Sequence, residues 1–167
     1  MMSKNNYQEL ADSIGYVLDG SSSISEEEEW KKSTTEHPIL SIINLARLKC
    51  QSLRKTYDES EIEFTWVEVS YVNQYKQRED LLDFTDLLEL FLVEIPNLCP
   101  RFALCFLDEA QDLSPLQWKI AHAIDALSTK FYVAGDDDQA IFRWAGARPE
   151  FLINMKGTRK VLNKSYR

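Results

Sequence analysis

The sequence lacks the excess of basic residues that marks most nucleic-acid-binding domains. Its 19 Lys and Arg residues are outnumbered by 27 Asp and Glu residues, which gives a net charge of −8. This balance argues against a broad basic face for DNA. Any contact with DNA is therefore expected to be local, or to depend on other parts of a larger protein.

Cysteine and histidine are scarce. The three cysteines, Cys50, Cys99 and Cys105, form no CxxC pair, and an odd number argues against a disulfide framework. With only His37 and His122 in addition, no zinc-binding pattern is present. The N-terminus has no apolar signal segment, and no apolar run approaches the length of a membrane span. The sequence predicts a soluble, reduced, cytoplasmic protein with no membrane segment.

A phosphate-binding loop is also missing. The nearest match to G-x-x-x-x-G-K-[ST] is "GYVLDGSS" at residues 15–22, where Gly15 and Gly20 have the correct spacing. No lysine follows Gly20, and the preceding residues are too polar for a buried strand. We interpret the glycine spacing as coincidence.

The first half of the chain has the periodicity of helices. Residues 36–58 place apolar side chains three and four positions apart, and Pro38 suits a first helical turn. The apolar positions are Ile39, Ile42, Ile43, Ala46 and Cys50. A second helix is predicted over about residues 61–79, with Ile62, Trp66 and Val69 on one side.

A third helix is predicted over about residues 84–95. It is expected to start at Thr85 or Asp86 and to stop at Pro96, because proline breaks helices.

The second half alternates strands and helices. "RFALCFLDE" (101–109) reads as a strand buried on both faces, and Ser114 with Pro115 starts the helix that follows. A second strand, a short helix and a third strand are predicted over 130–138, about 149–155 and 159–167. This order predicts an α/β fold with a parallel sheet.

Acidic residues follow the first two predicted strands. Asp108 and Glu109 end the first strand, and Asp136–Asp138 end the second. The carboxyl ends of parallel strands share one edge of a sheet, where ligands bind. Asp108 would suit Mg²⁺ and its waters, and Glu109 would polarise a water that attacks a phosphate. The alternative, in which these acids only end strands and form turns, stays open on this pattern alone.

Three motifs in order carry a family resemblance. "DEAQD" (108–112), "GDDDQAIFRWAGA" (135–147) and "NKSYR" (163–167) closely resemble motif II, motif III and the start of motif IV of the UvrD/Rep/PcrA group of superfamily 1 DNA helicases. "LLDFTDLLELF" (81–91) resembles the segment that precedes motif II in that group. The resemblance is specific over the second half of the chain and loose before it.

The resemblance implies a domain organisation. Residues 81–167 would form the C-terminal part of the ATPase subdomain 1A, with a partial RecA-like parallel sheet of the P-loop NTPase type. Residues 1–80 would form a mostly helical segment similar to subdomain 1B.

The resemblance also implies roles in ATP hydrolysis. Asp108 would hold the Mg²⁺ of MgATP, and Glu109 would be the general base. Gln139 would sense the γ-phosphate and link it to DNA. Tyr166 would stack on the adenine, and Arg167 would reach the γ-phosphate, where a guanidinium stabilises developing charge.

For DNA, the resemblance implies that Phe142 and Trp144 stack on single-stranded bases, which tolerates any base sequence. Where the family commonly has "RWRGA" this chain has "RWAGA", so Ala145 replaces an arginine. Arg143 is the residue left to make part of that contact. The alternative for both aromatics is a position in the hydrophobic core.

The expected function is a part in an ATP-dependent DNA helicase that translocates on single-stranded DNA and unwinds duplex DNA. The Walker A segment is expected upstream of these residues and the second motor domain downstream, so that the chain alone is inactive. The alternative is a non-catalytic helicase relic that binds DNA or a protein.

Overall fold

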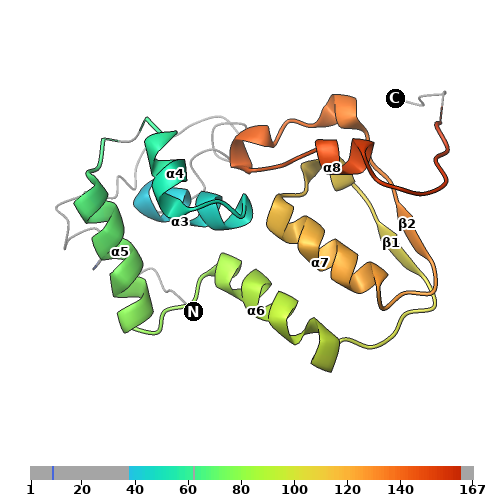
Figure 1. Ribbon diagram of the computed structural model, residues 1–167, viewed down its shortest axis with the longest axis horizontal. Coiled ribbons are helices and arrows are strands. Elements are labelled where there is room, and N and C mark those ends of the chain that lie inside the picture. Colours follow the sequence, from blue (N-terminus) through green and yellow to red (C-terminus); the bar gives the residue numbers. More distant parts are fainter. Residues whose placement is uncertain (1–8, 10–37, 62, 163–167) are drawn as a thin grey trace, which may run out of the picture.

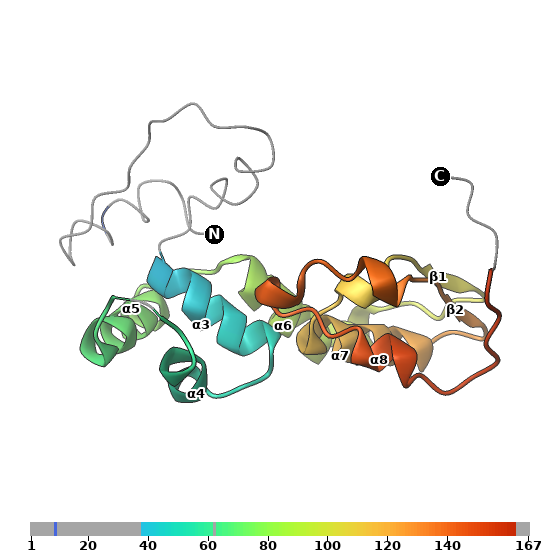
Figure 2. The same cartoon turned by 90° about the horizontal axis from the view of Figure 1, so that it is seen from above.

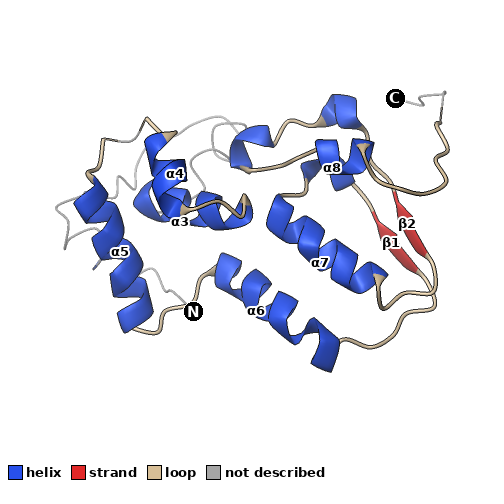
Figure 3. Cartoon of the chain, viewed as in Figure 1, coloured by secondary structure: helices blue, strands red, loops and turns tan. Residues whose placement is uncertain are grey.

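The computed structural model describes residue 9 and residues 38–61 and 63–162, and helices dominate this part of the chain (Figures 1 and 3). The helices are α3 (Pro38–Leu48), α4 (Leu53–Asp58), α5 (Trp66–Arg78), α6 (Phe84–Leu98), α7 (Pro115–Asp125) and α8 (Glu150–Ile153). The strands are β1 (Cys105–Leu107) and β2 (Phe131–Val133), and the 3₁₀ turns are η1 (Ala110–Asp112), η2 (Asp137–Gln139) and η3 (Arg143–Ala145). No described helix is both long enough and apolar enough to cross a bilayer.

The helix predicted over 36–58 is two helices. Cys50 has a φ of 51°, a left-handed conformation that ends a helix, and its side chain is exposed. The prediction that Cys50 shares the buried face of α3 is therefore wrong. Ser52 then caps α4 by accepting a hydrogen bond from the backbone N–H of Lys55. Pro38 is the first residue of α3, as predicted.

Capping boxes set the start of α5 and α6. Thr65 and Glu68 exchange side-chain and backbone hydrogen bonds, so α5 begins at Trp66 and not near residue 61. Asp83 and Asp86 make the same exchange at the start of α6. Helix α6 therefore begins at Phe84, one residue before Thr85, the earlier of the two predicted starts.

Pro96 lies inside α6 and does not stop it, which corrects the prediction. The helix ends two residues later, so the proline removes a hydrogen bond only in the final turn. The Cys99 N–H still donates to the Ile95 carbonyl at 3.0 Å.

The two strands form a parallel pair with α7 between them in sequence, as predicted. Cys105, Phe106 and Leu107 pair with Phe131, Tyr132 and Val133. Leu107, Phe131 and Val133 pack on the side of α7 and α8, which lie on the same side of the strands (Figure 2).

Burial on both faces was predicted for the first strand and is wrong, and the second strand is likewise exposed on one face. Phe106 and Tyr132 alternate to the opposite face and are 71% and 51% exposed. Within the described residues, their rings stack on each other with centroids 5.3 Å apart. Side chains of α7 and α8 pack against the inner face, which among the described residues is partly buried, whereas the outer face is exposed.

The third predicted strand is not formed over 159–162, and 163–167 lie outside the described residues. Val161 and Leu162 are exposed. Because a strand needs a neighbouring ladder for its hydrogen bonds, apolar character alone does not produce one here.

Among the described residues, buried apolar side chains form two main clusters. The first joins α3 and α5 through Ile39, Leu40, Ile43, Val69 and Val72. The second lies between the strands and α7, around Ala110, Trp118 and Ala121. Trp118, on α7, is only 1% exposed and is a core residue. The described residues thus form a mixed helical structure with a small parallel sheet, which is compatible with an α/β fold.

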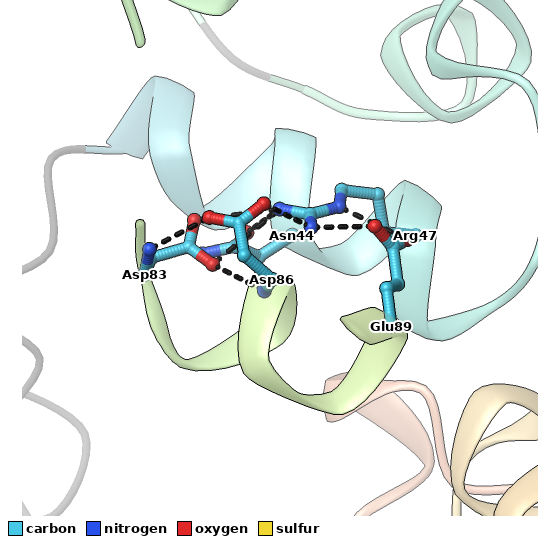
Figure 4. Close-up of polar contacts among 5 residues, drawn as sticks. All are labelled: Asn44, Arg47, Asp83, Asp86 and Glu89. Atoms are coloured by element: carbon cyan, nitrogen blue, oxygen red, sulfur yellow. Dashed lines mark hydrogen bonds and ion pairs between the residues drawn. The ribbon is translucent and has the colours of Figure 1, made fainter. Parts of the chain in front are cut away.

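Arg47 connects α3 to α6 (Figure 4). Its guanidinium binds Asp83 at 3.4 Å, Glu89 at 2.7 Å and the carboxylate of Asp86. Burial by itself would lower the pKa of Arg47, but the hydrogen bond to Glu89 and the surrounding carboxylates outweigh it and raise the pKa. Asp83 is buried, and the Arg47 guanidinium compensates its negative charge.

Replacing Arg47 tests this connection. Arg47→Met keeps most of the aliphatic stem but leaves buried Asp83 beside two other carboxylates. We expect a loss of about 1–3 kcal/mol in the free energy of unfolding, reduced from the value for a fully buried pair because Arg47 is partly exposed.

Urea denaturation measures the loss, and Arg54→Met is the control. Arg54 pairs with Asp58 on the surface, so its removal is expected to cost less than about 1 kcal/mol. Equal losses in the two variants would contradict a special role for Arg47.

Candidate functional site

The ends of β1 and β2 stay paired beyond the strands. The Ala134 N–H donates to the Leu107 carbonyl at 2.8 Å, and the Ala110 N–H donates to the Ala134 carbonyl at 3.0 Å. Asp108 and Glu109 follow β1, and Asp136 follows β2. The structure therefore brings the two acidic segments to one edge of the parallel pair.

Gln111 joins the two segments directly. Its side chain is buried in η1, where Nε2 donates to Glu109 Oε2 at 2.7 Å. At its other end, Oε1 accepts the Asp136 N–H at 3.0 Å. No role of its own was predicted for Gln111 within "DEAQD" (108–112). The available sequence signal was its position two residues after Glu109, which follows the first predicted strand.

Gly135 leaves the space for Gln111. A Cβ at position 135 would lie 2.6 Å from Gln111 Oε1 and 2.7 Å from Leu152 Cδ2. Both distances are too short for a carbon atom, so a side chain at position 135 would displace the ends of Gln111 and Leu152.

Glu109 has a left-handed backbone conformation, with φ 52° and ψ 39°. This region is uncommon for a residue with a side chain and carries a conformational cost. It turns the chain sharply from β1 into η1. The Glu109 N–H donates to Asp108 Oδ1 at 2.9 Å, and both carboxylates are exposed at the sheet edge.

Asp136 continues the network toward Gln139. Its Oδ1 accepts the Asp138 N–H at 3.1 Å, and its Oδ2 accepts from Gln139 Nε2 at 2.5 Å. Glu109, Gln111, Asp136 and Gln139 thus form one continuous hydrogen-bonded chain. It spans the two segments that resemble motifs II and III.

The aromatic residues of the second segment lie on and near the surface. Trp144 is 61% exposed and Phe142 is partly buried, with ring centroids 6.5 Å apart. Trp144 therefore does not lie in the core formed by the described residues. Arg143 Nη1 forms an ion pair with Glu150 Oε1.

The loop with these aromatics rests on α3. Gly146 follows η3 with a φ of 100°, and a Cβ there would be 3.4 Å from Leu45 Cδ1 and 3.5 Å from Lys49 Cγ. The helical first half of the chain therefore supports the loop that presents Trp144.

A magnesium site would have few protein ligands. Within the residues that the structure describes, no three His, Cys, Asp or Glu side chains converge as a metal cage. Mg²⁺ often uses one or two carboxylates, with waters and substrate phosphates completing its octahedron. The exposed Asp108 carboxylate fits that mode.

Tyr166 and Arg167, the predicted adenine and γ-phosphate contacts, lie outside the described residues, as do Gly15 and Gly20. Their positions relative to Asp108 and Glu109 stay predictions.

The environment of Asp112 disfavours its charged form. Its Oδ1 is buried without a hydrogen-bond partner in the described residues. Burial, and secondarily the negative charge of Glu109, raises the pKa of Asp112. A raised pKa means that the folded state binds this proton more tightly than the unfolded state.

The pH dependence of the free energy of unfolding tests the raised pKa of Asp112. Proton binding to Asp112 favours the folded state. This contribution to the free energy of unfolding is fully present below the ordinary pKa of 3.8 and is lost as pH rises through the raised value. Asp112→Asn has no such loss, so its stability relative to the native sequence should increase between pH 4 and pH 7. Urea unfolding at both pH values measures this difference.

Asp125→Asn, at an exposed position on α7, is the control for removing one negative charge. A stability difference between Asp112→Asn and the native sequence that does not change with pH would contradict the assignment.

Comparison with known proteins extends the likeness to most of the chain. Residues 7–160 match the family model described as the UvrD/REP helicase N-terminal domain. The ATP-dependent DNA helicase Rep of Buchnera aphidicola subsp. Acyrthosiphon pisum is 29% identical over 119 residues, which is 67% of this chain and 18% of that protein.

Two further relatives are DNA helicase II of Escherichia coli and of Haemophilus influenzae. The first is 32% identical over 119 residues, or 64% of this chain, and the second 31% over 114 residues, or 61% of this chain. Each alignment covers 16% of the relative, so the chain corresponds to a small part of these proteins. Because the family model matches well over half of its residues, the chain belongs to the UvrD/REP helicase N-terminal domain family.

Proposed function

We propose that the chain is part of an ATP-dependent DNA helicase, which couples ATP hydrolysis to movement on single-stranded DNA and to duplex unwinding. The observation that carries this proposal is the hydrogen-bonded chain from Glu109 through Gln111 and Asp136 to Gln139. It links the strand-end carboxylates to the loop with exposed Trp144. The names of the relatives, Rep and DNA helicase II, agree with this function.

In this proposal, Glu109 is the general base. Its carboxylate is exposed at the sheet edge and held by one side-chain hydrogen bond, so one oxygen is left to accept a proton from water. Asp108 would hold Mg²⁺, which when bound neutralises phosphate charge. Gln139 would respond to the γ-phosphate, and Tyr166 and Arg167 would contact the nucleotide.

DNA contact is assigned to the loop of η3. Trp144 and Phe142 offer ring faces for base stacking, which requires no broad basic surface. This agrees with the net charge of −8. Arg143 would contact DNA only if it left Glu150, its partner in this structure.

The chain is proposed to function within a larger assembly. Several large apolar side chains are exposed on α6 and on the outer face of β1, including Phe84, Val93, Leu98 and Phe106. Such surfaces usually meet other protein. A RecA-like sheet would be completed there by the segment with the phosphate loop, and the helical residues up to 80 would correspond to subdomain 1B.

ATP hydrolysis tests the proposed function. We expect the chain alone to be inactive, because its sequence contains no phosphate-binding loop. Combined with a phosphate-loop segment and a second motor domain, it should hydrolyse ATP. Glu109→Gln should then lower kcat by roughly 10²–10⁴-fold, because the general base is lost.

Glu59→Gln, at an exposed position after α4, is the control in this assay. Turnover by the isolated chain that disappears in Glu109→Gln would contradict the expected inactivity. An assembled protein that binds DNA without hydrolysing ATP would favour the alternative, a non-catalytic binding module.

Single-stranded DNA binding tests the role of Trp144. In the assembled protein, Trp144→Ala should weaken affinity by roughly 1–3 kcal/mol, because one stacking surface is removed. Fluorescence anisotropy with a labelled oligonucleotide measures the change. Tyr71→Ala, which removes an exposed aromatic ring from α5, should have a smaller effect. Unchanged affinity in Trp144→Ala would contradict the assignment.

A further inference from the structure

We propose that Gln111 is a positioning residue for hydrolysis, which orients the Glu109 carboxylate and links it to the segment that contains Gln139. This inference rests on the proposed function of Glu109 as the general base. It assigns to Gln111 a role separate from that of the residues expected to contact the nucleotide.

The first argument is that both ends of the Gln111 amide are used. The amide nitrogen donates to Glu109 Oε2 at 2.7 Å, and the amide oxygen accepts from the Asp136 backbone at 3.0 Å. The side chain is only 1% exposed, so water does not compete for these bonds. The amide therefore has one orientation in which both partners are satisfied.

The second argument concerns the mobility of Glu109. Its carboxylate is exposed, and a free glutamate side chain in that position would sample several rotamers. The short bond from Gln111 fixes one carboxylate oxygen and leaves the other for a proton acceptor role. A general base has to lie within hydrogen-bond reach of its water, so restricting the carboxylate favours the reaction.

The third argument is the continuation of the network. Asp136 is bound to Gln111 through its backbone and to Gln139 through its side chain. A displacement of the 136–139 turn would therefore change the bond that orients Gln111, and through it Glu109. The network gives a physical route by which contact at Gln139 affects the base.

Substitution by a residue of similar size tests this role. Gln111→Met removes both hydrogen bonds while filling the same space. In the assembled ATPase we expect kcat to fall roughly 10- to 100-fold, the range for a mispositioned catalytic group, with KM for ATP changed less than about 3-fold. An unchanged kcat in a folded variant would overturn the proposal.

Gln117→Met is the matched control. Gln117 also accepts a backbone N–H, from Ser114 at 2.9 Å, and is partly buried, but within the described residues its side chain has no hydrogen bond to an acid. Its loss should lower stability without lowering kcat. Equal losses of kcat in the two variants would show that Gln111 has only a structural role.

The Gln111→Glu variant tests the donor role of the amide separately from its acceptor role. At neutral pH its carboxylate still accepts the Asp136 N–H but has no proton to donate to Glu109. Protonation at lower pH restores a donor, so the kcat deficit relative to the native sequence should shrink as pH falls. A deficit that is constant with pH would overturn the orienting role.

Failure of the proposed function is distinguishable from failure of this inference. An assembled protein with no ATPase activity would overturn the function. In the isolated chain, NMR still tests the hydrogen bond: Glu109→Ala should shift a Gln111 Hε2 resonance and accelerate its exchange with water. An Hε2 resonance that does not respond to Glu109→Ala would overturn the inference directly.

Discussion

The hydrogen bond between the Asp136 backbone and the buried Gln111 side chain connects the two halves of the proposed catalytic edge. Two strands of three residues each form too small a sheet to fix the loops that follow them. Gln111 supplies the missing constraint from within η1, and Gly135 leaves the space that its oxygen needs. The relative positions of Glu109 and Gln139 follow from this link.

The helices extend the same constraint to the surface. Arg47 holds α3 on α6, and the end of α3 lies against Gly146, directly after η3. The position of the loop that carries Trp144 therefore depends on helices that lie outside the segments resembling motifs II and III. In the proposed assignment to subdomain 1B, the helical segment supports the loop that we propose to contact DNA.

Sequence patterns correctly predicted the features that depend on residues close together in the chain. Ser114 and Pro115 start α7, and the apolar runs around Phe106 and Tyr132 form a parallel pair. Sequence reasoning failed where tertiary surroundings decide. The left-handed Cys50 divides a continuous helical pattern, and the outer strand face is exposed because the described helices cover only the other face. Gln111 was missed because its partners are 2 and 25 residues away, which no periodicity reveals.

Hydrogen exchange at the Asp136 amide tests the central link most directly. Asp136 lies in an exposed segment after β2, where an amide without a protein partner would exchange rapidly. Because this amide donates to a buried glutamine, it should be strongly protected in the native chain, at a level similar to the Ala134 amide in the adjoining ladder. Exchange of the Asp136 amide at the rate of an unstructured peptide, with Ala134 still protected, would contradict the account.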